Sequence, residues 1–432
     1  MLTVFPSPLA QGCPGNESIG HDACPFLLAY AYLSSCRDLE RGTGMRFESS
    51  SFAALLKPID RRAFGQSVVD HDADRYGKSF SSWDHLVALV YAQMSGAESL
   101  RGLEADWNAH SHRHYHLGSD RLSRSTLSDA NQRRPWQVFG ETMTALAAQC
   151  GGRSGRESPE MLRIIDSTPI PLGALYDCGA SNGRINGLKM HVVYDPVNIR
   201  PLEAAVTKAN VHDVTAGLEV AIAKGTTYIF DKGYCSFAWW RQIAEKGAFF
   251  VTRPKTNMKW RSLRRRYENE EVKGEGFKIL RDAEVKLASK GDSKLPIALR
   301  LIKVKRDGAK TITILTNDMI RTAAQIAALY KGRWQIELLF RWLKQHLKIR
   351  RFMGRSESAI RIQLIAAIIA FLLMRIAIKL NQIKMPMLRF ADLIKRCIFS
   401  NRTIATLDKP PTVNSPKLKQ VKCPSQIEFY YA

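Results

Sequence analysis

The chain has 432 residues, of which 45% are hydrophobic and 9% aromatic, so it is long enough to bury a substantial core and to form two or three domains. Its 64 Lys and Arg residues outnumber the 40 Asp and Glu residues and give a formal net charge of +24, which favours a polyanionic partner, nucleic acid before an anionic membrane surface. The eight cysteines include no C-x-x-C pair, which argues against a zinc ribbon or a disulfide scaffold and indicates a reducing compartment.

Residues 1–44 differ in composition from the rest of the chain. They contain no lysine, two arginines, four acidic residues and three of the eight cysteines. We expect this segment to be a disordered extension or an artefact of an upstream start, with the functional protein beginning near Met45. No pattern of basic residues followed by an apolar stretch and a cleavage site is present, so nothing in it indicates secretion.

Helical periodicity runs from about residue 52 to 148 and predicts an all-α N-terminal domain over residues 45–150. One helix start in this region, SRSTLSDANQRR, carries several bases that could meet DNA phosphates, and a solvated basic helix explains it equally well. The alternating histidines of HSHRHYH (residues 110–116) are expected to form a solvated connector rather than a metal site.

A Gly- and Ser-rich linker at 151–160 separates the helical region from a mixed pattern of short apolar strands and helices. This pattern predicts an α/β domain over residues 155–380, with a strongly basic β-strand insertion at about 253–312. A long helical region follows and includes the apolar run Leu364–Met374, which is too short to cross a bilayer and is expected to be a buried core helix. Residues 381–432 are expected to form a C-terminal helical segment and tail.

Two acidic residues follow buried strands in the α/β region. Asp166 comes after the apolar run LRII, and Asp231 comes after TYIF. Carboxylates at strand ends lie at the rim of a sheet, where ligands collect in α/β folds. Each taken alone is more simply explained as an ordinary turn residue.

A third acid, Glu337, stands alone among many bases in the helical stretch YKGRWQIELLFRWLK (330–344). The spacing of Tyr330, Arg333, Glu337 and Lys344 predicts one polar stripe on a helix whose opposite face is apolar. An acid in this setting is either a salt-bridge partner or a metal ligand beside a track for DNA. Three carboxylates suit two Mg²⁺ or Mn²⁺ ions, which could activate a water or a 3′-hydroxyl in phosphodiester chemistry.

These residues together resemble a known family. Asp166 in IIDSTPI, Asp231 in IFDKGY and the Tyr330, Arg333, Glu337 and Lys344 spacing look like the DDE transposases of bacterial insertion sequences, in the large fourth family marked by a Y-R-E-K signature. The match extends over roughly residues 45 to 400. It implies a helical DNA-binding N-terminal domain and a ribonuclease H-like catalytic domain with a β-strand insertion.

The resemblance also implies roles for individual residues. Asp166, Asp231 and Glu337 would bind the two metal ions, and Tyr330, Arg333 and Lys344 would contact DNA phosphates near the cleaved end. Trp260 is the one tryptophan of the insertion and could stack on a flipped base, although a packed core tryptophan explains it at least as well.

The implied activity is cut-and-paste DNA transposition through nicking, hairpin formation and opening, and strand transfer. The implied partners are double-stranded DNA at the transposon ends and target, and a second copy of the chain on DNA, with no membrane and a cytoplasmic, nucleoid-associated location. A catalytically inactive or domesticated sequence-specific DNA-binding protein is the alternative, and a repair or junction nuclease with the same core is a third.

Overall fold

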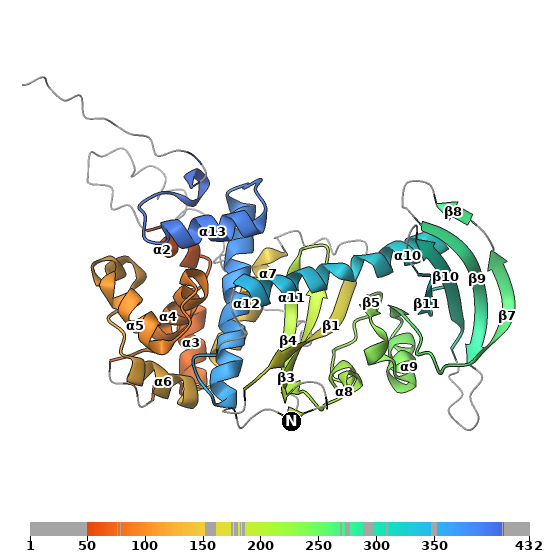
Figure 1. Ribbon diagram of the computed structural model, residues 1–432, viewed down its shortest axis with the longest axis horizontal. Helices are drawn as coiled ribbons and strands as arrows, with labels where there is room; N and C mark the ends of the chain where they lie inside the picture. Colours follow the sequence, from red (N-terminus) through yellow and green to blue (C-terminus); the bar gives the residue numbers. More distant parts are fainter. Residues whose placement is uncertain are drawn as a thin grey trace, which may run out of the picture.

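The computed structural model describes residues 50–407 and 409 with several gaps. The gaps are residues 76, 78, 152–160, 174, 175, 177–179, 182, 184, 185, 268, 269, 273–276, 288–296, 307–309 and 347–351. The expected extension 1–44, the linker and most of the tail therefore lie outside the described residues. Figure 1 shows three parts side by side, namely a helical region, a central sheet and a β-rich extension.

The helical region begins with six α-helices and one 3₁₀ helix. These are α2 (Ser51–Leu56), α3 (Arg61–Asp70), α4 (Ser82–Ser95), α5 (Leu100–Ala109), η3 (Ser111–Leu117), α6 (Arg124–Arg133) and α7 (Gln137–Cys150). Helix α4 shows why the boundaries fall where they do. The Ser81 side chain and the Asp84 side chain form a reciprocal capping box at its start, and Gly96 ends it in the left-handed conformation with φ 77°.

Two helices from the end of the chain complete this region. The apolar helix α12 (Glu357–Leu380) packs against α4 and α7, and α13 (Met387–Cys397) packs against α2 and α4. By length and composition α12 could cross a membrane, but 83% of its most apolar window is buried inside the protein. Its apolarity is that of a core helix, as the run Leu364–Met374 predicts.

The central sheet has the strand order β4-β3-β1-β5-β6. These strands are β1 (Leu162–Pro171), β3 (Asn186–Asp195), β4 (Arg200–Lys208), β5 (Thr227–Phe230) and β6 (Phe249–Thr252), with the short β2 (Ala180–Ser181) beside β3. Strand β1 is antiparallel to β3 and parallel to β5, and β6 is parallel to β5. Three antiparallel strands followed by two parallel ones confirm the expected ribonuclease H-like catalytic fold.

The β-rich extension continues the same sheet beyond β6. Its strands are β7 (Trp260–Tyr267), β8 (Glu270–Val272), β9 (Phe277–Leu287), β10 (Leu299–Arg306) and β11 (Ile312–Thr316), in the order β6-β11-β10-β9-β7 with β8 beside β9. It interrupts the chain between β6 and the helices that follow β11. Inside it, Arg300 and Asp282 form a buried ion pair through bonds of 2.7 and 2.5 Å.

The two faces of the central sheet carry separate cores. Ile164 belongs to the core shared with the helical region, whereas its neighbour Ile165 belongs to a second core under α9 (Phe237–Glu245), because successive side chains of a strand point to opposite faces. Helices α10 (Ala323–Gly332) and α11 (Trp334–His346) run from the extension across the first face (Figure 1). The short α8 (Asp213–Leu218) and η4 (Lys232–Tyr234) lie next to one another.

Candidate active site

Asp166 and Asp231 are placed side by side by strand register. The parallel pairing of β1 with β5 ends at Ile165 opposite Phe230, so the next residue on each strand is an aspartate. Asp166 is not at a strand end as expected, because the antiparallel partner β3 carries β1 on to Pro171. Asp166 lies where the parallel pairing of β1 with β5 stops, and this position places its carboxylate at the edge of the parallel strands, as a strand end would.

Glu337 reaches these aspartates from α11. Five residues in the described part of this helix are buried in the first core and fix which face it presents, namely Ile336, Leu339, Phe340, Trp342 and Leu343. The expected continuous stripe from Tyr330 to Lys344 is broken, since α10 ends at Gly332 and α11 starts at Trp334. The intervening Arg333 still has a right-handed helical conformation, so the direction of the chain is nearly kept.

Arg333 links two of the three carboxylates directly. Its guanidinium donates a hydrogen bond of 2.6 Å to Asp166 Oδ2 and another of 2.6 Å to Glu337 Oε1. Tyr330 donates a longer bond of 3.3 Å to Asp231 Oδ1. The predicted acids and two of the predicted DNA-contacting residues therefore form two hydrogen-bonded groups, which lie side by side with the Arg333 guanidinium 5.9 Å from the centre of the Tyr330 ring.

The protonation equilibria of this group are shifted by burial and by the neighbouring charges. Burial raises the pKa of Asp166 to about 6, while Arg333 and the backbone N–H of Ser167 oppose that shift. Burial likewise raises the pKa of the Tyr330 phenol to about 12, so it remains a hydrogen-bond donor at neutral pH. Burial lowers the pKa of Arg333, but Asp166, the Tyr330 phenol and Glu337 outweigh it and the net pKa is raised.

The three acids and Arg333 open into one pocket of about 490 Å³. Its walls are Asp166, Ser167, Thr168, Asp231, Arg333, Glu337, Phe340, Arg341 and Lys344. Within the described residues no three acidic, histidine or cysteine side chains converge closely enough to hold an ion as they stand. The cation that joins Asp166 to Glu337 in this structure is the guanidinium of Arg333.

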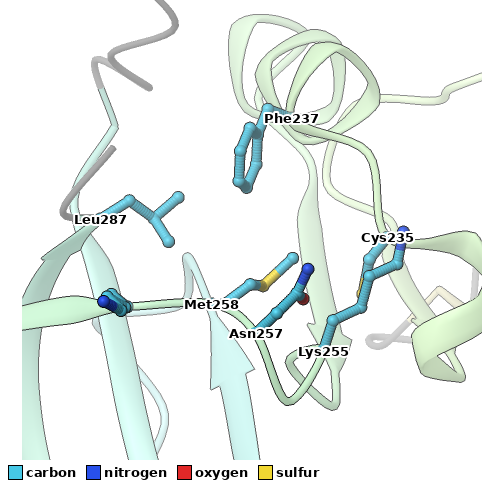
Figure 2. A pocket seen from close by; sticks show the side chains of 7 residues that line it. Cys235, Phe237, Lys255, Asn257, Met258 and Leu287 are labelled. Carbon is cyan, nitrogen blue, oxygen red and sulfur yellow. The ribbon is translucent and has the colours of Figure 1, made fainter. Parts of the chain in front are cut away.

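Lys344 and Trp260 occupy different surroundings. Lys344 lines the pocket beside the carboxylates. Trp260 lies at the start of β7, outside that pocket, and its partly buried ring packs against the second core with Met258 and Phe237. Trp260 directly follows residues 255–259, four of which line a second pocket of about 370 Å³. Figure 2 shows Phe237, Met258 and Leu287 around this pocket together with Lys255.

Sequence reasoning missed one part of this region, which lies behind the carboxylates. Ser167 donates a hydrogen bond of 3.2 Å to Asp213, and Lys189 forms an ion pair with the same carboxylate at 3.2 Å. Lys189 also donates a hydrogen bond of 2.8 Å to the carbonyl of Val211. The only signal for Asp213 in the sequence is an ordinary His-Asp helix start at 212–213.

Comparison with known proteins identifies the family. A family model described as "Transposase DDE domain" matches residues 157–373, and one described as "Domain of unknown function (DUF4372)" matches residues 48–120. The chain therefore belongs to the transposase DDE domain family, and it is an enzyme of the transposase class. Assignment to the fourth insertion-sequence family by the Y-R-E-K signature stays a prediction.

Individual relatives agree with this family. A putative transposase, y4zB, of Sinorhizobium fredii is 57% identical over 306 residues, which cover 71% of this chain and 85% of the relative. A probable transposase for insertion sequence element IS5377 of Geobacillus stearothermophilus is 26% identical over 60% of this chain and 68% of its own length. The piggyBac transposase in a synaptic complex with hairpin DNA aligns at a TM-score of 0.41 and 11% identity, covering 85% of this chain and 84% of that one.

Proposed function

We propose that this transposase binds the terminal inverted repeats of an insertion sequence and catalyses metal-dependent cleavage and strand transfer of DNA. The observation that carries the proposal is the meeting of Asp166, Asp231 and Glu337 in one pocket with a basic rim. The three acids come from β1, the end of β5 and α11, which are far apart in sequence. A salt bridge alone would not need three acids in the same pocket.

The donor set fits hard divalent ions. All three side chains offer carboxylate oxygens, which Mg²⁺ and Mn²⁺ prefer, and two of them already share a cation in the form of Arg333. Asp166, Asp231 and Glu337 would hold two ions once the Arg333 guanidinium withdraws. Bound there, the ions would lower the pKa of a water or hydroxyl nucleophile and neutralise charge on the leaving oxygen.

Basic side chains around the carboxylates would hold the DNA through its phosphates. Lys344 and Arg341 border the carboxylates and would neutralise the phosphates on either side of the scissile bond. Tyr330 holds Asp231 by its hydrogen bond, and Arg333 could exchange its single bonds to Asp166 and Glu337 for a phosphate, whose oxygens can accept two bonds from one guanidinium. Further from the site, Arg261, Arg264 and Arg265 are exposed on strand β7 and would extend the phosphate track.

Trp260 is proposed to support an unpaired base near the cleaved end. The partly buried ring belongs to the second core, and it borders a pocket with apolar walls and the basic side chains of Lys255 and Lys259 (Figure 2). Stacking on an aromatic surface lowers the cost of taking a base out of the duplex. Loss of the ring in Trp260→Ala should then reduce hairpin formation more than first-strand nicking.

The remaining expectations belong to the same proposal. We propose that two copies act together on DNA, that the pathway is cut-and-paste through hairpin ends, and that the protein works in the cytoplasm on the nucleoid. The helical region 45–150 is proposed to contact the inverted repeats, and the catalytic region to extend over 155–380 with the insertion at about 253–312.

The proposal is tested by the substrate. A labelled duplex carrying the flanking inverted repeat should be nicked and converted to a hairpin in Mg²⁺ or Mn²⁺, whereas a scrambled duplex of equal length should not. Tight binding without cleavage would favour the inactive or domesticated DNA-binding protein instead. Cleavage that follows DNA shape rather than the repeat sequence would favour a junction nuclease.

A further inference from the structure

Asp213 lies behind the carboxylate pocket, on the opposite face of the sheet. On β1 the side chains alternate, so Asp166 shares a face with Ile164 in the first core, and Ser167 shares a face with Ile165 in the second. Ser167 donates its hydroxyl to Asp213 Oδ1 at 3.2 Å. Asp213 therefore contacts Ser167, the residue next to Asp166, on the face of the sheet opposite to the Asp166 side chain.

Lys189 holds Asp213 in this place. Its ammonium lies 3.2 Å from Asp213 Oδ1 and donates a 2.8 Å bond to the carbonyl of Val211. Only 17% of the Lys189 side chain and 24% of the Asp213 side chain are exposed, so the pair is shielded from solvent. Lys189 lies on β3 opposite Pro169 of β1. Through Lys189 and Ser167, Asp213 therefore connects the start of α8 to β3 and to β1.

The same carboxylate meets the turn that carries the second aspartate. A Cβ atom at Gly233 would lie 2.8 Å from Asp213 Oδ2, so the glycine lets the backbone of the Asp231–Tyr234 turn come close to this oxygen. The turn is held from a second side as well. Tyr234 shares a 2.9 Å hydrogen bond with His191, and a Cβ atom at Gly217 of α8 would lie 3.1 Å from the Tyr234 ring.

We propose that Asp213 is a positioning residue that sets the spacing between Asp166 and Asp231 by holding Ser167 and the Gly233 turn from behind. Ser167 is the next residue after Asp166, and Gly233 is two positions after Asp231, so a shift of the Asp213 carboxylate would move both aspartates. The inference rests on the proposed metal role of the two aspartates. Groups that orient metal ligands from the next layer typically change metal affinity by about 10- to 100-fold when they are removed.

The Asp213→Asn variant tests the inference in the full-length protein. Asparagine keeps the size of the side chain and an acceptor for Ser167 but removes the charge that faces Lys189. Mn²⁺ binding, followed by the electron paramagnetic resonance signal of the free ion, should weaken by about tenfold or more. Glu219→Gln is the matched control, because Glu219 is an exposed acid at the other end of the same helix. It should bind Mn²⁺ as the wild type does.

The melting temperature separates positioning from general support of the fold. Wild-type Mn²⁺ affinity in Asp213→Asn would overturn the inference, whether the melting temperature is lowered or unchanged. If Asp213→Asn does not fold, Ser167→Ala decides the question, since it cuts the link to β1 and leaves the Lys189 pair intact. Weaker Mn²⁺ binding in Ser167→Ala supports the inference and unchanged binding overturns it.

Failure of the proposed function gives a different result. If the wild-type protein binds no Mn²⁺, or binds it no better than Asp166→Asn does, the proposed metal site is wrong. The positioning role is then wrong as well. Binding in the wild type that is lost in Asp166→Asn but kept in Asp213→Asn overturns the positioning role alone.

Discussion

Arg333 donates a 2.6 Å hydrogen bond to Asp166, a residue 167 positions away in the sequence. The same guanidinium also donates a hydrogen bond to Glu337, so one fixed positive charge is shared by two of the three acids that line the pocket. Such a contact stabilises the packing of α11 on β1. In the proposed mechanism it is also exchanged for metal ions and DNA phosphate before the acids act.

Arg333→Gln should therefore raise the affinity of the DNA-free protein for Mn²⁺ while lowering DNA cleavage. The substitution removes the cation that competes with metal ions, and it also removes the proposed contact of Arg333 with phosphate. A several-fold tighter dissociation constant is expected by titration with Mn²⁺. Arg341→Gln is the control, because Arg341 lines the same pocket and its substitution removes an equal charge. Equal tightening in both variants would show a general field effect and contradict the direct competition.

Lys344→Gln should reduce cleavage at the inverted repeat by roughly tenfold or more and leave non-specific DNA binding nearly unchanged. One phosphate contact is a small part of a surface with net charge +24, and its loss should lower the salt slope of binding by about one at most. Lys331→Gln, on an exposed residue outside the pocket, is the comparison. Parallel loss of binding and cleavage in Lys344→Gln would argue against a contact at the reacting phosphate.

Glu203 makes stability depend on pH. It is 9% exposed on β4, and burial raises its pKa to about 7, well above the 4.5 of a free glutamate. Because the folded protein holds this proton more tightly than the unfolded chain, its contribution is complete below about pH 4.5 and is lost as pH rises through 7. The loss is up to about 3 kcal/mol.

Glu203→Gln should accordingly raise the melting temperature at pH 8 and change it little at pH 5, since glutamine resembles the protonated acid. Scanning calorimetry at the two pH values measures the difference between the variant and the wild type. An equal shift at both pH values would mean that the side chain acts by packing and not by its ionisation.

Asp282→Ala should destabilise the β-rich extension strongly. Asp282 is 3% exposed and accepts two hydrogen bonds from Arg300, which is itself 2% exposed. Removing the acid leaves a buried guanidinium without its countercharge, which costs about 3–5 kcal/mol. Hydrogen exchange of β9 and β10 should accelerate while that of α4 stays slow. The double variant Asp282→Ala, Arg300→Met should recover part of the loss, and no recovery would contradict the charge explanation.

Much of the site follows from local sequence. The apolar runs before Asp166 and Asp231 form the parallel pairing of β1 with β5, and the spacing of Ile336, Leu339, Phe340 and Leu343 gives the buried face of α11. These are periodic patterns, which report burial directly. The distance between the acids is different, since it depends on strand register and no pattern within one segment specifies it.

Tertiary contacts explain the misses. Asp213 has an ordinary turn sequence and gains its place only when β3 brings Lys189 beside it. The connector 110–116 was expected to be solvated, but it forms a 3₁₀ helix in which His114 is 3% exposed and stacks on Trp107 at 3.9 Å. Similarly, α12 packs on α4 and α7, which lie far earlier in the chain. The apolar sequence of α12 therefore predicts that it is buried, but not which helices it contacts.

Glu337→Gln tests the three-carboxylate mechanism most directly, by cleavage of a labelled inverted-repeat duplex in Mg²⁺ or Mn²⁺. The substitution keeps the size of the side chain and an acceptor for Arg333, and removes the negative charge that metal binding needs. We predict nicking and hairpin formation by the wild-type protein, loss of both by at least about a hundredfold in the variant, and equal DNA binding by the two. Cleavage by the variant at the wild-type rate would contradict the mechanism.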